Sequence, residues 1–444
     1  MTSSKIQKDI VSACAQEIVK AIIDDLDGDF FEILVDESKD ISHHEQMTIA
    51  LRYVNKKGKV NERVIAIVRV GDTSTKTLKE TICSLLMRHS LSTSKIRGQG
   101  YDGASSMQGE MNGLKALILQ ETPSAYSTAK KYLLVDDFFA IISNVLNVVG
   151  ASFKRRDQLR DHHAEILEQL LESVHVLDAI KCGGSNFNDR LQAGAFLSMI
   201  NEFEFAFLLH LMLKILVMSN ELSASLQRKE QDIVNAMIFL DITKKRLQLP
   251  SSVTYSHHLR VELFYAIIDL QLQELNNPFD VVSGNLLLGM ASLNPINAFT
   301  NFDKKKIMIF VKHFPDEFGE SKLQELSYQL DTFIIHMRRG DPIFSNLKGI
   351  GDLAEALVNA NLVGTYSLMY LLVKLTLILP VATATVEKAF SSVKYIKNKL
   401  RSSIGDAFLS NCLVCYIEKD IFINISNDVI IDCFQNMKTR RYLV

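Results

Sequence analysis

Residues 380–422 constrain the fold of this chain more than any other segment of its sequence. Shortly after Pro380, one acid, Glu387, stands among small residues, and a helical run rich in lysine follows. The next helical run carries more apolar residues than one amphipathic face needs, and they include Phe408, Leu409, Leu413, Tyr416 and Ile417. These residues fit either an intrachain core or an interface between two copies. Glu387 also has a structural explanation, because the helix dipole favours an acid in the first turn.

The N-terminal part of the sequence predicts three strands, a helix and a fourth strand, in that order. Apolar runs, β-forming residues and turn residues place the strands at 30–35, 47–54, 63–70 and 96–101, and the helix at 78–91. The third strand is expected to turn Val64, Ala66, Val68 and Val70 to one face. This order is typical of the opening of an RNase H-like domain, in which the first and fourth strands are neighbours.

An acid follows the first predicted strand, Asp36, and another follows the fourth, Asp102. If the two strands are neighbours, these carboxylates meet at one end of the sheet, where they repel each other unless a divalent cation holds them. A third acid from a later helix would complete a two-metal site for phosphoryl transfer. The alternative is structural, because acids after strands also form turns and cap helices.

The net charge and the apolar segments of the chain limit the partners that it can have. The formal net charge is −2, so any contact with DNA must come from local basic patches. One such patch places Lys394, Lys397 and Arg401 close to one helical face, although a solvated surface is the better explanation for any single cluster of this kind. The two most apolar segments, 203–218 and 366–386, contain charged residues, and a membrane span needs about 20 mostly apolar residues. Buried helices are therefore expected, with no membrane partner.

The motifs around the three acids resemble one protein family. TATVEKAFS, around Glu387, resembles the C-terminal region of hAT-family DNA transposases, in which this helix carries the last catalytic acid and the surrounding helices dimerise. ILVDESKD and KIRGQGYDGASS, around Asp36 and Asp102, resemble plant hAT-derived proteins of the zinc finger MYM-type protein 1-like group. The resemblance implies that Asp36, Asp102 and Glu387 are catalytic and bind Mg²⁺. It also implies a homodimer in the nucleus, with the cytoplasm as the alternative location, for which DNA is a weak partner and no small molecule is a substrate.

Three departures from the family accompany the resemblance. After Tyr126 the family continues with a strand and a C-x-x-H helix, which this sequence lacks. The chain has no tryptophan, and Met1 stands where the family has an internal residue after a zinc finger. A sheet without its edge strand exposes another strand, and a catalytic site needs its groups held to within about 0.5 Å. Impaired catalysis is therefore expected.

The resulting prediction is an α/β protein with an incomplete RNase H-like core, interrupted by a long all-helical insertion, and with C-terminal dimerisation helices. The expected domains are an N-terminal helix at 1–27, the first half of the core at 28–125, the insertion at 126–350 and the dimerisation region at 351–444. Two other functions stay open, namely an active metal-dependent DDE-type transposase and a non-catalytic DNA-binding regulator.

Overall fold

The computed structural model describes residues 3–72, 74–101, 113–121, 181–182, 190, 217–218, 220–228, 232–248, 281–339, 342–344, 346–379, 384–397 and 404–437. Contacts divide the chain into two compact units. The first comprises residues 1–131, 226–238 and 279–444, and the second comprises 132–225 and 239–278. The predictions for Asp102, Arg401 and most of the helical insertion concern residues outside the described ranges.

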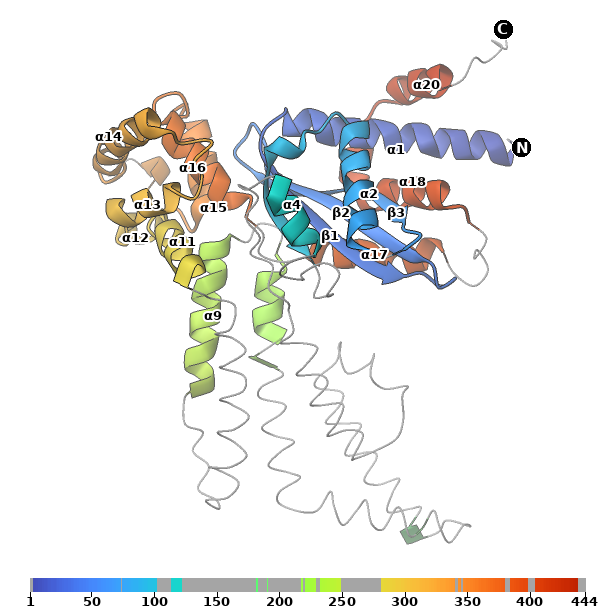
Figure 1. Ribbon diagram of the computed structural model, residues 1–444, viewed down its shortest axis with the longest axis horizontal. Coiled ribbons are helices and arrows are strands. Elements are labelled where there is room, and N and C mark those ends of the chain that lie inside the picture. The colour runs from blue at the N-terminus through green and yellow to red at the C-terminus, as the bar shows by residue number, and fades with distance from the viewer. Residues whose placement is uncertain are drawn as a thin grey trace. The chain divides into compact units, whose positions relative to one another are not determined.

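The first unit contains a four-stranded sheet (Figure 1). Its strands are β1 (Phe31–Lys39), β2 (Glu45–Val54), β3 (Val60–Arg69) and β4 (Ile96–Tyr101), in the order β3-β2-β1-β4. β1 pairs antiparallel with β2 and parallel with β4, and β2 pairs antiparallel with β3. The predicted neighbourhood of the first and fourth strands is thus confirmed. The β2–β3 turn requires Gly58, which has φ +79° and lies so close to Ala354 that a Cβ would stand 2.7 Å from its carbonyl oxygen.

Helices cover both faces of this sheet (Figure 1). On one face, α1 (Ser4–Leu26), α2 (Thr75–Arg88) and α4 (Leu114–Glu121) pack on an apolar cluster that includes Ile33 and Val35 of β1. Successive side chains of a strand alternate between faces, so Leu34 points to the other face. There it packs against α17 (Ala384–Ile396) in a separate cluster.

The prediction that Val64 shares a face with Ala66, Val68 and Val70 is wrong. The register between β2 and β3 shifts at Ile49 and Ala50, so that Ala66 pairs with Ile49 but Val64 pairs with Ala50. An extra residue in one strand reverses the alternation beyond it. Val64 therefore packs with Leu34 on the α17 face, whereas Ala66 belongs to the cluster on the opposite face.

The C-terminal helices α18 (Asp406–Ile417), α19 (Lys419–Phe422) and α20 (Asn427–Asn436) belong to the same unit as the sheet. α18 lies against β3, at one edge of the sheet formed by the described strands (Figure 1). Two side chains accept hydrogen bonds from the backbone of that edge: Glu418 from the N–H of Val64 at 2.7 Å, and Ser410 from the N–H of Ile67 at 3.1 Å. Unpaired groups at a sheet edge invite aggregation, and α18 covers them here.

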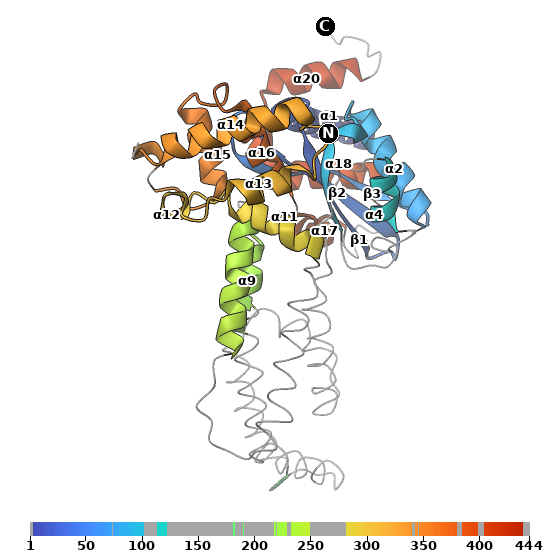
Figure 2. The same ribbon diagram turned by 60° about the vertical axis from the view of Figure 1, so that its left-hand side comes forward.

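A second apolar cluster of this unit gathers helices from the later part of the chain (Figure 2). They are α11 (Val281–Ala291), α12 (Ile296–Phe299), α13 (Lys304–Val311), α14 (Glu320–Met337), α15 (Ile350–Asn359), α16 (Ser367–Leu377) and the first residues of α9 (Ile233–Gln248). Edge-to-face rings strengthen this core, such as Phe299 on Phe333 at 5.6 Å between ring centres. Within the described ranges, no helix has the length and apolar character needed to cross a membrane.

Candidate functional site

Asp36 lies near the end of β1, where the sequence predicts a metal site. Its side chain is nearly buried, at 8% exposed. The preceding residue, Val35, pairs with Tyr101, which is the last residue of β4. Asp102, the next residue of the chain, lies outside the described residues. The two strands thus run side by side as far as the residue before each predicted acid.

Glu387 stands in the first turn of α17, on a helix that covers the same face of the sheet as Asp36. Leu34 and Asp36 alternate onto that face, and Leu34 packs against Val386, the neighbour of Glu387. Glu387 itself is exposed. The structure therefore brings the strand of one predicted acid and the helix of another to one side of the sheet.

A buried hydroxyl next to Asp36 bears on whether a cation fits here. Thr48 pairs directly with Asp36 across β1 and β2, so the two side chains share a face. Its hydroxyl is fully buried and has no hydrogen-bond partner among the described residues, and such groups in native structures often mark a water or an ion. Asp36 and Glu387 supply carboxylate oxygens, which Mg²⁺ prefers. No group of three metal-ligating side chains occurs among the residues described.

A row of three charged side chains crosses the same face of the sheet. Glu32, Arg52 and Glu62 stand opposite one another on β1, β2 and β3. Arg52 Nη1 donates to Glu62 Oε1 at 2.6 Å, whereas Arg52 Nε lies 3.9 Å from Glu32 Oε2. Glu32 is fully buried, and neither of its oxygens has a hydrogen-bond partner among the described residues. Burial raises the pKa of Glu32 well above its ordinary value, although Arg52 partly opposes this.

The same row holds the chain on either side of residues 380–383. Arg52 Nε donates to the carbonyl oxygen of Leu377, the last residue of α16, at 2.9 Å. Glu62 accepts a short hydrogen bond from the hydroxyl of Thr385, in the first turn of α17. Space for the buried Glu32 comes from Gly98 of β4, where a Cβ would stand 3.1 Å from that of Glu32.

Lys397 was predicted to contact DNA, and the structure contradicts this. Its ammonium lies 2.6 Å from Asp40 Oδ2, and its side chain is 1% exposed. Asp40 also accepts hydrogen bonds from the Gln46 side chain and from the backbone of Ser42 and His44. Burial opposes the charge of Asp40, but these bonds outweigh it and lower the pKa of Asp40 to about 2. Of the predicted basic patch, Lys394 is exposed and Arg401 lies outside the described residues.

The predicted interface residues of α18 divide into two groups. Leu409 and Leu413 are fully buried against Ile67, Phe390 and Val393 of the same chain. Their assignment to an interface is therefore corrected, because α18 uses them to pack on α17 and β3.

The remaining members of that set are more accessible. Ile417 packs partly on the same core, and Phe408 is half-buried with Lys8 Nζ 5.8 Å from its ring centre. Tyr416 is 52% exposed, and its ring lies 6.4 Å from that of Tyr395, which is 73% exposed. Sequence reasoning missed Tyr395, although its position beside Lys394 on the polar side of a basic helix was a usable signal.

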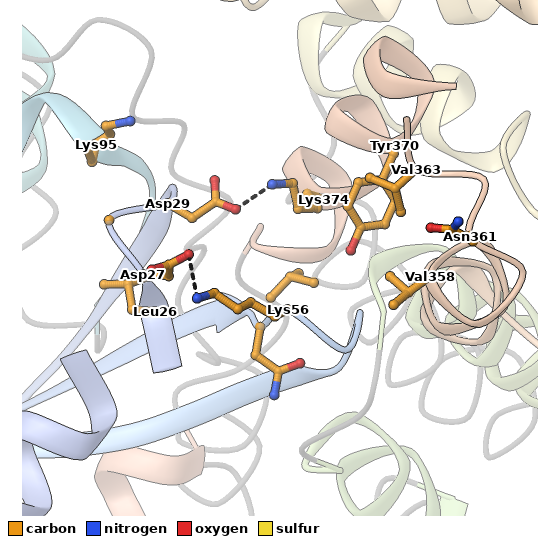
Figure 3. Close-up of a pocket in the computed structure, with 13 residues that line it drawn as sticks. Leu26, Asp27, Asp29, Lys56, Lys95, Val358, Asn361, Val363, Tyr370 and Lys374 are labelled. Carbon is orange, nitrogen blue, oxygen red and sulfur yellow. Dashed lines mark hydrogen bonds and ion pairs between the residues drawn. The ribbon is translucent and has the colours of Figure 1, made fainter. Parts of the chain in front are cut away.

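A pocket of about 500 Å³ lies beside residues 26–29, just before the start of β1, whereas Asp36 is further along that strand. Figure 3 shows the residues that line it. Two ion pairs line it, Lys56 with Asp27 at 2.9 Å and Lys374 with Asp29. Tyr370 forms part of its wall, and burial raises the pKa of Tyr370 to about 12. Lys56 and Lys374 are therefore already neutralised by carboxylates, whereas a third lysine of the lining, Lys95, lies over the ring of Phe30 at 4.8 Å.

The strand order, the parallel β1–β4 pair and a helix on the face of Asp36 define an RNase H-like α/β core. Residues 1–113 match the DUF4371 family, described as the ZMYM1/FAM200 RNase-like domain. The match includes all four strands, Asp36 and Asp102, and it fits a transposase-derived protein related to the zinc finger MYM-type group. It ends before Glu387 and the C-terminal helices.

Proposed function

We propose that this chain is a transposase-derived nuclear protein that forms homodimers through its C-terminal helices and has lost most or all strand-transfer activity. The observation that carries the dimer is the pair of exposed rings, Tyr395 and Tyr416, on helices anchored to the core. Tyrosine is enriched at protein interfaces, because it offers a large contact area with a polar tip. Ile423 of the adjoining segment adds exposed apolar surface, at 79%.

The dimer can be tested by size-exclusion chromatography with light scattering at micromolar concentration. The wild-type chain is expected to elute as a dimer, and the double variant Y395D/Y416D as a monomer. Hot-spot residues of an interface, among which tyrosine is enriched, contribute about 2 kcal/mol or more each, so we expect the dissociation constant to rise at least about 100-fold. The matched control is Tyr328→Asp on α14, which changes a tyrosine that is also 73% exposed. A monomeric wild-type chain, or a dimer that survives the double variant, would contradict the proposal.

The loss of activity is proposed because the sequence after Tyr126 departs from the family's pattern of an edge strand followed by a C-x-x-H helix. Without that support, the carboxylates near Asp36 would be held less rigidly than phosphoryl transfer requires.

The second candidate is a metal-dependent DNA strand transferase, favoured by the placement of Asp36 and the Glu387 helix on one face of the sheet. Asp36 and Glu387 would hold Mg²⁺ together with Asp102, and the ion would stabilise charge on the attacked phosphate. The role proposed for these three carboxylates is to bind the cation and so to place it beside the attacked phosphate.

This second candidate predicts Mg²⁺-dependent nicking of supercoiled DNA by the wild-type chain. Asp36→Asn removes one ligand charge and is expected to abolish nicking, while Asp72→Asn, an exposed acid at a helix N-terminus, leaves it unchanged. Nicking that persists in Asp36→Asn would point to a contaminating nuclease.

The third class, a non-catalytic regulator, predicts salt-sensitive DNA binding that survives Asp102→Asn.

A further inference from the structure

Buried polar side chains fasten α17 to the sheet at both of its ends. At the start, the Thr385 hydroxyl donates to Glu62 of β3, and both side chains are 7% exposed. At the end, Lys397 follows the last helical residue and pairs with Asp40, the residue after β1. Lys397 and Asp40 are 2% and 5% exposed.

α17 also buries apolar side chains. Val386 and Ala389 pack on one small cluster, and Phe390 and Val393 on another. Such non-directional contacts tolerate small slides of a helix along a sheet, whereas a hydrogen bond from Thr385 or Lys397 requires one geometry. A buried ion pair is weak evidence for added stability. The fixed geometry of the two polar contacts explains their role better than added stability does.

We infer that Thr385 and Lys397 are positioning residues for Glu387. Together they set the register of α17 along the sheet, and so hold the Glu387 carboxylate at the level of β1 that the cation site at Asp36 requires. Glu387 is two residues from Thr385, so a displacement of the first turn moves it directly. This inference rests on the second candidate function, the metal site, and is independent of the dimer.

The test uses Mn²⁺ as the probe, titrated into the full chain and followed by water-proton relaxation. Thr385→Val and Lys397→Met each remove the donor group and keep most of the side-chain volume. Losses of groups that orient ligands commonly weaken metal affinity about 10- to 100-fold, and we expect a weakening in this range for both. Asp36→Asn and Glu387→Gln should weaken binding at least as much.

Two further variants and two measurements separate a positioning role from a general loss of structure. Thr385→Ser keeps the hydroxyl and should bind Mn²⁺ like the wild-type chain. Ser391→Ala removes an exposed hydroxyl of the same helix and should have no effect. Circular dichroism and urea unfolding identify the variants that remain folded, and if Lys397→Met does not fold, the comparison of Thr385→Val with Thr385→Ser decides.

Unchanged Mn²⁺ affinity in a folded Thr385→Val chain would overturn the inference. It would also be overturned by a wild-type chain that binds no Mn²⁺, a result that leaves the proposed dimer intact. The wild-type chain could also be a monomer that binds Mn²⁺, with weaker binding in Thr385→Val. That result would support the inference and contradict the proposed dimer.

Discussion

Replacement of Glu418 by alanine is expected to lower the free energy of unfolding by about 3–5 kcal/mol, the usual cost of breaking a buried ion pair. Glu418 is 1% exposed and joins α18 to the sheet. One of its oxygens accepts from the N–H of Val64, and the other lies 2.8 Å from Arg63 Nη1. The variant leaves a buried N–H without its acceptor and weakens the cover over the edge of β3.

The matched control is Asp420→Ala, because Asp420 contacts the same guanidinium at 2.7 Å but has a side chain that is 60% exposed. Exposed ion pairs contribute less than about 1 kcal/mol, so the control should change stability little. Urea unfolding followed by circular dichroism measures both variants. If Glu418→Ala costs no more than Asp420→Ala, Glu418 does not anchor α18.

The second large effect is expected for Arg52→Met. Arg52 is the only cation in its row, which also contains Glu32 and Glu62, and its removal leaves the buried Glu62 carboxylate without its ion-pair partner. We expect a loss of about 3–5 kcal/mol in the free energy of unfolding. The bond to the Leu377 carbonyl is lost as well, so amides at the end of α16 should exchange faster with deuterium.

The matched variant in this row is Glu32→Gln, which should leave the free energy of unfolding nearly unchanged or raise it. The pKa of Glu32 is higher in the folded chain than in the unfolded chain. The stability that it contributes is therefore complete below its unfolded pKa and is lost as the pH rises through its folded pKa. Glutamine has no proton to lose in this range. As the pH rises through the folded pKa of Glu32, the urea concentration at the midpoint of unfolding should therefore fall less for Glu32→Gln than for the wild-type chain. Parallel pH profiles for the two chains would contradict a protonated Glu32.

Local patterns in the sequence were sufficient for the order of the strands and for the position of Asp36. Runs of β-forming residues separated by turns determine which segments are strands, and the acid at the end of a strand needs no long-range information. The face of Val64 could not be predicted in this way, because the shifted pairing at Ala50 depends on how β2 and β3 meet. Tyr395 was missed because exposure on a helix depends on which neighbours cover it.

By itself, the sequence determined that this chain contains an RNase H-like order of strands and a lysine-rich helix after Pro380. Only the tertiary structure decided what the side chains of that helix do. The sequence alone suggests that Lys397 is solvated, yet the structure buries it in an ion pair with Asp40, which lies 357 positions away in the chain. Leu409 and Leu413 read as interface residues, yet they pack on β3 and α17. Periodicity defines the apolar face of a helix, but the partner that covers a face comes from distant parts of the chain, and burial follows from that partner.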